Sequence, residues 1–145
     1  MDNKQYDNHL GIIGWLGGGR WGVERYLYIL HRVTGLGILL FFLIHIFASS
    51  MRMYGPETWA AAMAILKNPI FKLGEFFVFV AFAFHALNGI RLILIELGLA
   101  VGKAEEPIYP YKSSLNNQRP LMVIVMVVVA ILIIAGGYNT FFGSH

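Results

Sequence analysis

The chain has 145 residues, of which 57% are hydrophobic and 13% charged, and its mean hydropathy is +0.63. Soluble domains have about 45–50% apolar and about 25% charged residues, so these values indicate a single domain that is solvated by lipid. The net charge of +3 comes from Lys and Arg scattered between apolar runs, which does not indicate nucleic-acid binding. The sequence has no cysteine, which excludes disulfides, cysteine-ligated iron–sulfur clusters and c-type haem attachment in this chain.

The first 23 residues form a polar, glycine-rich N-terminal segment. It has no basic stretch followed by a short apolar core, so we do not expect a cleaved signal peptide. We therefore expect two regions, which are an N-terminal tail, 1–23, and a single transmembrane domain, 24–145.

Three apolar stretches are long enough for the about 20 helical residues that cross a bilayer. The first covers 33–51, with a helix that begins near Glu24, and the second covers 73–99. The third covers 121–142 and follows Pro120, a residue that suits a first helical turn. The predicted fold is an all-α membrane protein with three transmembrane helices.

A short fourth helix is expected between the first and second spans. Pro56-Glu57-Thr58 is typical of a helix start, and Asn68-Pro69 is typical of a stop. The Ala- and Met-rich stretch from Trp59 to Leu66 is too short to span a bilayer, so we expect it to lie in the membrane interface. Residues 102–119 hold charges, prolines and serines and are expected to form a loop.

The distribution of basic residues predicts the orientation. Eight of the eleven Lys and Arg fall on the side of the N-terminus and of the second loop. The positive-inside rule then places the N-terminus inside and the C-terminus outside a cell's inner (cytoplasmic) membrane. The eight are Lys4, Arg20, Arg25, Arg32, Arg91, Lys103, Lys112 and Arg119, and the other three are Arg52, Lys67 and Lys72.

Polar groups inside a membrane are costly, so each one in a span is a candidate for function. His31 and His45 are fourteen residues apart, which puts them on one face of the first helix and about 21 Å apart along its axis. Such a face should point into a bundle. The full set is His31, Arg32 and His45 on the first helix, and Glu75, His85, Asn88, Arg91 and Glu96 on the second.

A neutral imidazole in an apolar site is a good axial ligand for haem iron. His85 is expected at mid-depth and His45 nearer the outside, about 10 Å apart from the helical rise, so they are poorly placed to ligate one iron. Each would need a partner histidine from another chain. Haem propionates favour cationic groups at the membrane boundary, where His31, Arg32 and Arg91 are expected.

Ordinary structural roles stay open for all of these residues. A histidine in a membrane helix is often a hydrogen-bonding member of a helix interface, and glycines such as Gly35 and Gly89 often serve close packing. His31-Arg32 at a helix end would equally serve as an interfacial anchor.

Two segments resemble a known family. Leu-His-Arg-Val-Thr-Gly at 30–35 resembles the His-Arg-x-Ser/Thr-Gly signature on helix one of the cytochrome b556 subunit of succinate dehydrogenase. His-Ala-Leu-Asn-Gly-Ile-Arg at 85–91 resembles the family's His-x-x-x-Gly-x-Arg signature on helix two. His45 and the Tyr-Gly-Pro-Glu-Thr-Trp loop resemble versions with two membrane-anchor subunits from actinobacteria and archaea.

The resemblance implies a membrane anchor of a succinate:quinone oxidoreductase (complex II), an enzyme of electron transport and the tricarboxylic acid cycle. Such a subunit pairs with a second three-helix anchor and docks a flavoprotein and an iron–sulfur subunit on the inner side. His85 matches the family's haem b axial ligand, and His45 is a candidate ligand for a second haem. His31, Arg32 and Arg91 match neighbours of the propionates, and Tyr28 with Arg32 would border the quinone pocket.

The sequence departs from the family's pattern at three positions. Tyr28 stands where the family often has Ser near the quinone, Leu92 stands where a His is common, and Glu96 stands where an Asp is common. Two alternatives stay open, which are a haem-free anchor of a fumarate reductase-type complex and, from another class, a small transporter subunit with a proton relay.

Overall fold

The computed structural model describes residues 22–102, 108–109 and 114–143. Within these ranges the regular structure is helical, with α2 (Val23–Ser50), the short 3-10 helix η1 (Met51–Tyr54), α3 (Pro56–Leu66), α4 (Pro69–Glu96) and α5 (Leu115–Phe142). This confirms the predicted fold of three long helices with a short one between the first and second. The predicted N-terminal tail, 1–23, lies outside the described residues except for its last two.

The three long helices have the length and composition of membrane spans. Helices α2, α4 and α5 have 28 residues each, which corresponds to about 42 Å of helix. All three are long and apolar enough to cross a membrane. The chain is therefore a multi-pass membrane protein, and its orientation in the membrane stays a prediction.

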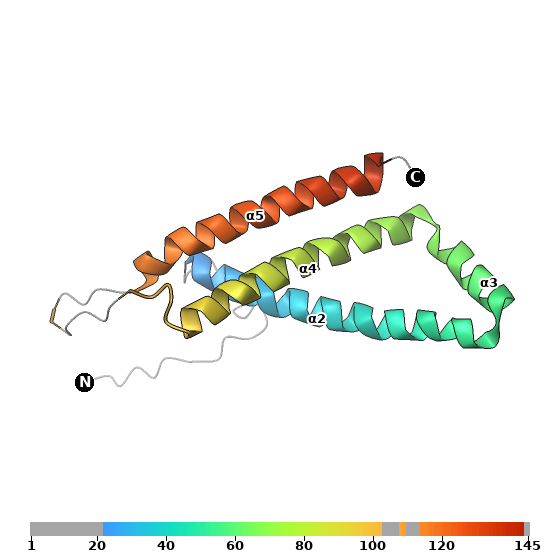
Figure 1. Ribbon diagram of the computed structural model, residues 1–145, viewed down its shortest axis with the longest axis horizontal. Helices are drawn as coiled ribbons and strands as arrows, with labels where there is room; N and C mark the ends of the chain where they lie inside the picture. Colours follow the sequence, from blue (N-terminus) through green and yellow to red (C-terminus); the bar gives the residue numbers. More distant parts are fainter. Residues whose placement is uncertain (1–21, 103–107, 110–113, 144–145) are drawn as a thin grey trace, which may run out of the picture.

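Helix α4 is the central element of the bundle. It packs against α2 on one side and against α5 on the other. Figure 1 shows α2 and α4 close together near the start of α2 and diverging toward α3, which joins their far ends. Four residues of α4 are buried, namely Ala83, Phe84, Asn88 and Arg91.

Two helix boundaries differ from the sequence prediction. Helix α4 begins at Pro69 rather than near residue 73, because the Asn68 side chain accepts a hydrogen bond from the Ile70 N–H at 3.0 Å and caps the helix. Helix α5 begins at Leu115, so the expectation that Pro120 lies in the first turn was wrong. The extra turn is polar, and Arg119 within it forms an ion pair with Glu24 of α2 at 3.0 Å.

The turn into α3 depends on a glycine and on one cation–π contact. Gly55 has a φ of +103°, a conformation that side chains with a Cβ rarely adopt. The Arg52 guanidinium lies over the Trp59 ring, 4.5 Å from its centroid. These features return the chain from the end of α2 into α3, and α3 occupies the predicted place between the spans.

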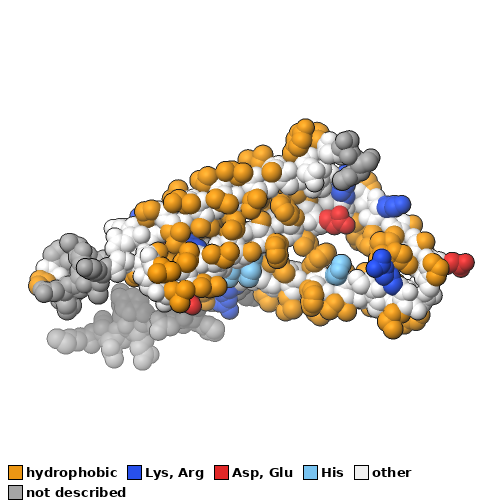
Figure 2. Space-filling view, viewed as in Figure 1, with side chains coloured by type: hydrophobic (Ala, Val, Ile, Leu, Met, Phe, Trp, Pro, Cys, Tyr) orange, Lys and Arg blue, Asp and Glu red, His pale blue; other side chains and the backbone are white. Residues whose placement is uncertain are grey.

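The core of the bundle is small because most apolar side chains face outward. Leu27, Phe84 and Val129, one from each long helix, form the buried cluster. In contrast, Leu36 is 63% exposed and Phe47 is 68% exposed. Such surface would be unfavourable in water, but lipid tails solvate it. The exposed apolar surface visible in Figure 2 is thus consistent with a membrane environment.

Two glycines allow close packing between α5 and α4. A Cβ placed on Gly136 would collide with the Phe79 ring, and one placed on Gly137 would lie 3.3 Å from the Phe76 ring. Small residues let membrane helices approach each other closely where the hydrophobic effect gives no drive between them. The Phe side chains of α4 therefore fill the space that these glycines leave.

We predict that Gly136→Ala destabilises the protein by about 1–3 kcal/mol, the usual cost of overpacking, because the Phe79 ring must move. Gly74→Ala is the matched control, since a Cβ on Gly74 would meet nothing within 4 Å. Thermal unfolding of the full chain in detergent measures both variants. Equal midpoints for Gly136→Ala and the unsubstituted protein would contradict the packing role.

Candidate functional site

Two histidines from different helices meet where α2 and α4 pack together. The rings of His31 and His85 are stacked, with centroids 3.9 Å apart and planes 6° from parallel. Figure 2 shows histidine side chains set among hydrophobic ones in this part of the molecule. The sequence analysis separated these residues by depth, with His31 at the inner rim and His85 at mid-depth. The structure corrects this, because the crossing of α2 and α4 brings both rings to one level.

The hydrogen bonds of His85 define its tautomer. Its Nδ1 lies 3.0 Å from the His31 carbonyl oxygen. A carbonyl only accepts hydrogen bonds, so Nδ1 carries the proton and donates. A neutral ring protonated on Nδ1 keeps its lone pair on Nε2. The His31 ring covers one face of the His85 ring, and the Nε2 lone pair lies in the ring plane.

Thr34 adds a second contact to the same nitrogen. Its hydroxyl lies 3.3 Å from His85 Nδ1 and donates to the carbonyl oxygen of Leu30 at 2.8 Å or of His31 at 3.0 Å. With its proton directed at a carbonyl, the Thr34 oxygen can accept from the His85 N–H. The backbone of α2 and the Thr34 side chain thus orient the His85 ring together.

Glycines leave the room that the two imidazoles occupy. A Cβ on Gly35 would lie 2.8 Å from His85 Cε1, and a Cβ on Gly89 would lie 3.5 Å from His31 Cε1. Gly35 is therefore required for the present position of His85, while Gly89 provides ordinary contact space. In this respect the structure agrees with the expectation that the face of α2 with His31 and Gly35 points into a bundle.

One ring nitrogen of His31, Nδ1, is buried and makes no hydrogen bond among the described residues. A buried polar atom without a partner is costly, so it favours a polar group supplied by something that binds beside it.

Tyr28 and Arg32, expected at a quinone pocket, lie together on α2. Arg32 Nη1 donates to the Tyr28 hydroxyl at 3.3 Å, and its guanidinium lies 5.5 Å from the centre of the Tyr28 ring. Tyr28 is 54% exposed. The pair therefore presents a phenol and a guanidinium side by side at the surface of the bundle, near its predicted inner end.

Arg91 takes a place that the sequence analysis did not foresee. It is only 5% exposed, and its Nη1 donates to Asn88 Oδ1 at 2.8 Å. Asn88 is 1% exposed. Both residues belong to the face of α4 that bears Phe84, a member of the core cluster formed with α2 and α5. Its expected role beside a haem propionate stays a prediction.

His45 is not brought together with the other two histidines. It is exposed in this chain, and its ring contacts the Phe41 ring at a centroid distance of 5.8 Å. His45 lies in the last two turns of α2, and α2 and α4 diverge toward this end, where α3 joins them (Figure 1). Its expected role as a ligand for a second haem stays a prediction.

Two features of this region are not predicted from the sequence. The first is the contact of Thr34 with His85. Thr34 belongs to the signature at 30–35 and lies one turn after His31, and this spacing was the available indication that its hydroxyl lies beside His85. The ion pair between Glu24 and Arg119 had no signal, because the two residues are 95 positions apart. Only the packing of α5 onto the bundle brings them into contact.

A comparison with protein families identifies the fold family. The family model for the succinate dehydrogenase/fumarate reductase transmembrane subunit matches residues 3–134. The chain belongs to this family. Its three spans and its histidine pair are thus features of one transmembrane subunit of the succinate dehydrogenase/fumarate reductase family.

Individual relatives agree with this membership. The chain is 41% identical over 69 residues to the succinate dehydrogenase 2 membrane subunit SdhC of Mycobacterium tuberculosis, covering 48% of this chain and 51% of the relative. It is 26% identical over 95 residues to the succinate dehydrogenase hydrophobic membrane anchor subunit of Halobacterium salinarum, covering 63% and 73%. It is 27% identical over 106 residues to a fumarate reductase subunit of Proteus vulgaris, covering 73% and 81%. The chain thus matches about half the length of the first of these relatives.

We predict that Asn88→Leu destabilises this transmembrane protein by about 1–3 kcal/mol, because it leaves the buried Arg91 guanidinium without its acceptor. The double variant Asn88→Leu/Arg91→Met removes both partners and should recover part of this loss. Thermal unfolding in detergent compares the two. If the single variant is at least as stable as the double variant, the hydrogen bond does not hold Arg91 in place.

Proposed function

We propose that the chain is a haem b-binding membrane anchor that helps pass electrons from an iron–sulfur subunit to membrane quinone in a succinate:quinone oxidoreductase. The observation that carries the proposal is the His85 imidazole, which is fixed with its proton on Nδ1 and its lone pair on Nε2. Family membership and the names of the relatives support the complex to which the anchor would belong.

The residues present fit a haem. Metal-ligating histidines usually donate their second ring nitrogen to a carbonyl or carboxylate, which sets the tautomer and the ring orientation, and His85 has this arrangement with the His31 carbonyl. A haem needs only one or two imidazoles, so the lack of a cluster of three or more His, Asp or Glu among the described residues does not count against it. Because Gly35 has no Cβ, the His85 ring can lie against the backbone of α2 in this orientation.

Each nearby residue has a distinct task in this proposal. His85 would be the axial ligand, and Thr34 with the His31 carbonyl would hold its ring. The open Nδ1 of His31 would donate a hydrogen bond to a haem propionate. A bound haem b would supply reversible one-electron storage beside the quinone site.

Tyr28 and Arg32 would border the quinone. A guanidinium next to a quinone oxygen stabilises negative charge that develops there on reduction, and the Tyr28 hydroxyl can donate a hydrogen bond. Because Arg32 donates to the Tyr28 hydroxyl, the guanidinium and the phenol lie next to each other on α2 and could both face one quinone oxygen. Quinone would therefore approach from the bilayer at the predicted inner end.

The proposal includes partners that supply what this chain lacks. A second membrane anchor would provide the other axial histidine, and iron–sulfur and flavoprotein subunits would dock at the predicted inner side. The isolated chain would not be catalytic. His45, exposed on α2, would be a second ligand only if a partner brings a histidine to its level.

A haem-free anchor is the second candidate. The stacking of His31 on His85 and the bond from Nδ1 to the His31 carbonyl would by themselves join α2 to α4. The likeness to fumarate reductase subunits of two Proteus species is compatible with this role. It predicts a purified complex without stoichiometric haem.

The test compares His85→Ala with His45→Ala in the full-length chain, purified in detergent with the subunits that accompany it. We expect one haem b per chain in the unsubstituted protein, measured as pyridine haemochrome. His85→Ala should abolish the reduced low-spin b-type spectrum, and His45→Ala should leave it in place. An unchanged spectrum in His85→Ala would refute the ligand assignment, and a complex without haem would favour the second candidate.

A second pair of variants tests the space around His85. Gly35→Ala places a methyl group 2.8 Å from His85 Cε1, whereas a Cβ on Gly37 would meet nothing within 4 Å. We expect Gly35→Ala to weaken haem binding about 10- to 100-fold, as loss of a ligand's supporting contacts does, and Gly37→Ala to leave it unchanged. Equal haem content in the two variants would show that the ring does not depend on this space.

A further inference from the structure

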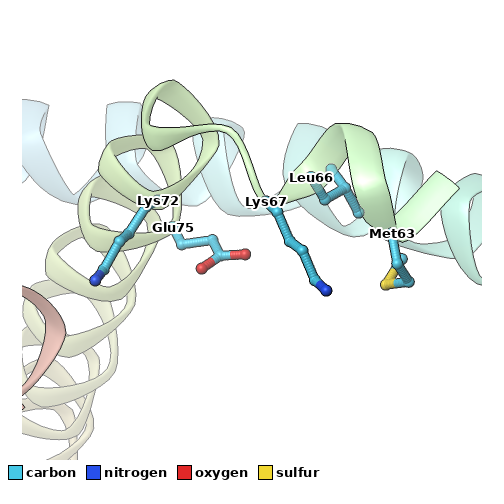
Figure 3. Close-up of a pocket in the computed structure, with 5 residues that line it drawn as sticks. All are labelled: Met63, Leu66, Lys67, Lys72 and Glu75. Carbon is cyan, nitrogen blue, oxygen red and sulfur yellow. The ribbon is translucent and has the colours of Figure 1, made fainter. Parts of the chain in front are cut away.

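A cavity of about 480 Å³ lies at the corner between α3 and α4, far from the histidine pair. Met63 and Leu66 of α3 form its apolar wall, and three charged residues complete the lining, namely Lys67, Lys72 and Glu75. Figure 3 shows the three charged side chains extending to the same open side, with the Glu75 carboxylate between the two lysine ammonium groups.

The corner lies at the end of the membrane span. Phe76 of α4 packs at Gly137 of α5, so the first turns of α4 are level with the polar sequence Tyr138-Asn139-Thr140 that follows this glycine. The chain turns from α3 into α4 at Asn68. The cavity is therefore at the level of the lipid headgroups, whichever side of the membrane this end faces.

The charges of the cavity are not paired with one another. By contrast, Arg52 stacks on Trp59 and Arg119 pairs with Glu24. In the described ranges, no ion pair joins the two lysines of the cavity to Glu75. The amides in the first turn of α4 are engaged by Asn68, so side chains rather than backbone would hold a ligand here.

We propose that this cavity binds the headgroup of a phospholipid that carries a primary ammonium, as in phosphatidylethanolamine. The lysines bind the phosphate through charge-assisted hydrogen bonds. Glu75 accepts hydrogen bonds from the ammonium group. Met63 and Leu66 pack against the glycerol and the first acyl carbons, which a free phosphate lacks.

The pattern of charges selects among phospholipids. A cavity that presents both signs is complementary to a zwitterion. Phosphatidylcholine has a phosphate, but its trimethylammonium group has no N–H to donate to Glu75. Phosphatidylglycerol offers hydroxyl donors but no positive charge for the carboxylate. Phosphatidylethanolamine is the one of the three that satisfies the lysines and Glu75 together.

The experiment titrates the delipidated full-length protein, with the subunits that accompany it, with phosphatidylethanolamine, phosphatidylglycerol and phosphatidylcholine of equal acyl chains. Bound lipid is counted by native mass spectrometry. We expect phosphatidylethanolamine to bind about three- to tenfold more tightly than the other two, as one additional charge-assisted hydrogen bond allows. Inorganic phosphate should not displace it.

Matched variants identify the residues. Lys67→Gln/Lys72→Gln should weaken binding of phosphatidylethanolamine and of phosphatidylglycerol, whereas Glu75→Gln should remove only the preference for phosphatidylethanolamine. Glu57→Gln is the control at the same end of the molecule, since Glu57 does not line the cavity. Circular dichroism checks that each variant keeps its helical content.

Several outcomes would overturn the proposal. These are equal binding of phosphatidylethanolamine and phosphatidylcholine, tighter binding of phosphatidylglycerol than of phosphatidylethanolamine, displacement by inorganic phosphate, and a loss in Glu57→Gln as large as those in the cavity variants. Retention of the lipid preference in Glu75→Gln would also refute the role of the carboxylate.

Discussion

The hydrogen bond from His85 to the His31 carbonyl is the constraint on which the rest of the site depends. It joins α2 and α4 at the level where they pack, and with the Thr34 hydroxyl it sets the ring orientation and the tautomer of His85. This hydrogen bond can form only because residue 35 is a glycine, since a Cβ at this position would displace the His85 ring. In the apolar surroundings of a membrane span, a polar side chain oriented in this way is a candidate for function as well as for helix packing.

The same requirement governs the polar core of the bundle. Lipid offers no hydrogen bonds, so polar groups in a span must be satisfied inside the protein or face a ligand. Arg91 Nη1 donates to Asn88 Oδ1 within α4, while Arg91 Nε and Asn88 Nδ2 are buried without a partner among the described residues. Glu24 and Arg119 join α2 to α5. The Glu24–Arg119 pair links α5 to a bundle whose buried apolar core is small. The histidine pair lies beside this arrangement, on the side of α4 that faces α2.

The sequence predicted the spans, the short helix and the inward face with His31 and Gly35, because length, hydropathy and helical periodicity are local properties. The sequence did not predict features that depend on how the helices pack against one another. The crossing of α2 and α4 brings His31 level with His85, which depth measured along separate helices could not show. The partner of Glu24 depends on how α5 docks, and Asn68 starts α4 as well as ending α3. The signature residues were found by resemblance, but their contacts required the fold.

Hydrophobicity alone does not say which exposed faces meet lipid and which meet another protein, because lipid tails are as apolar as leucine. The distribution of polar residues distinguishes the two kinds of surface. The face of α2 that carries His31 and Gly35 continues to His45, beyond the point where α4 diverges (Figure 1). A lipid-facing surface would not retain an exposed imidazole in mid-span. In the function proposed above, a second membrane anchor that covers His45 would also supply the other axial ligand of a haem held by His85.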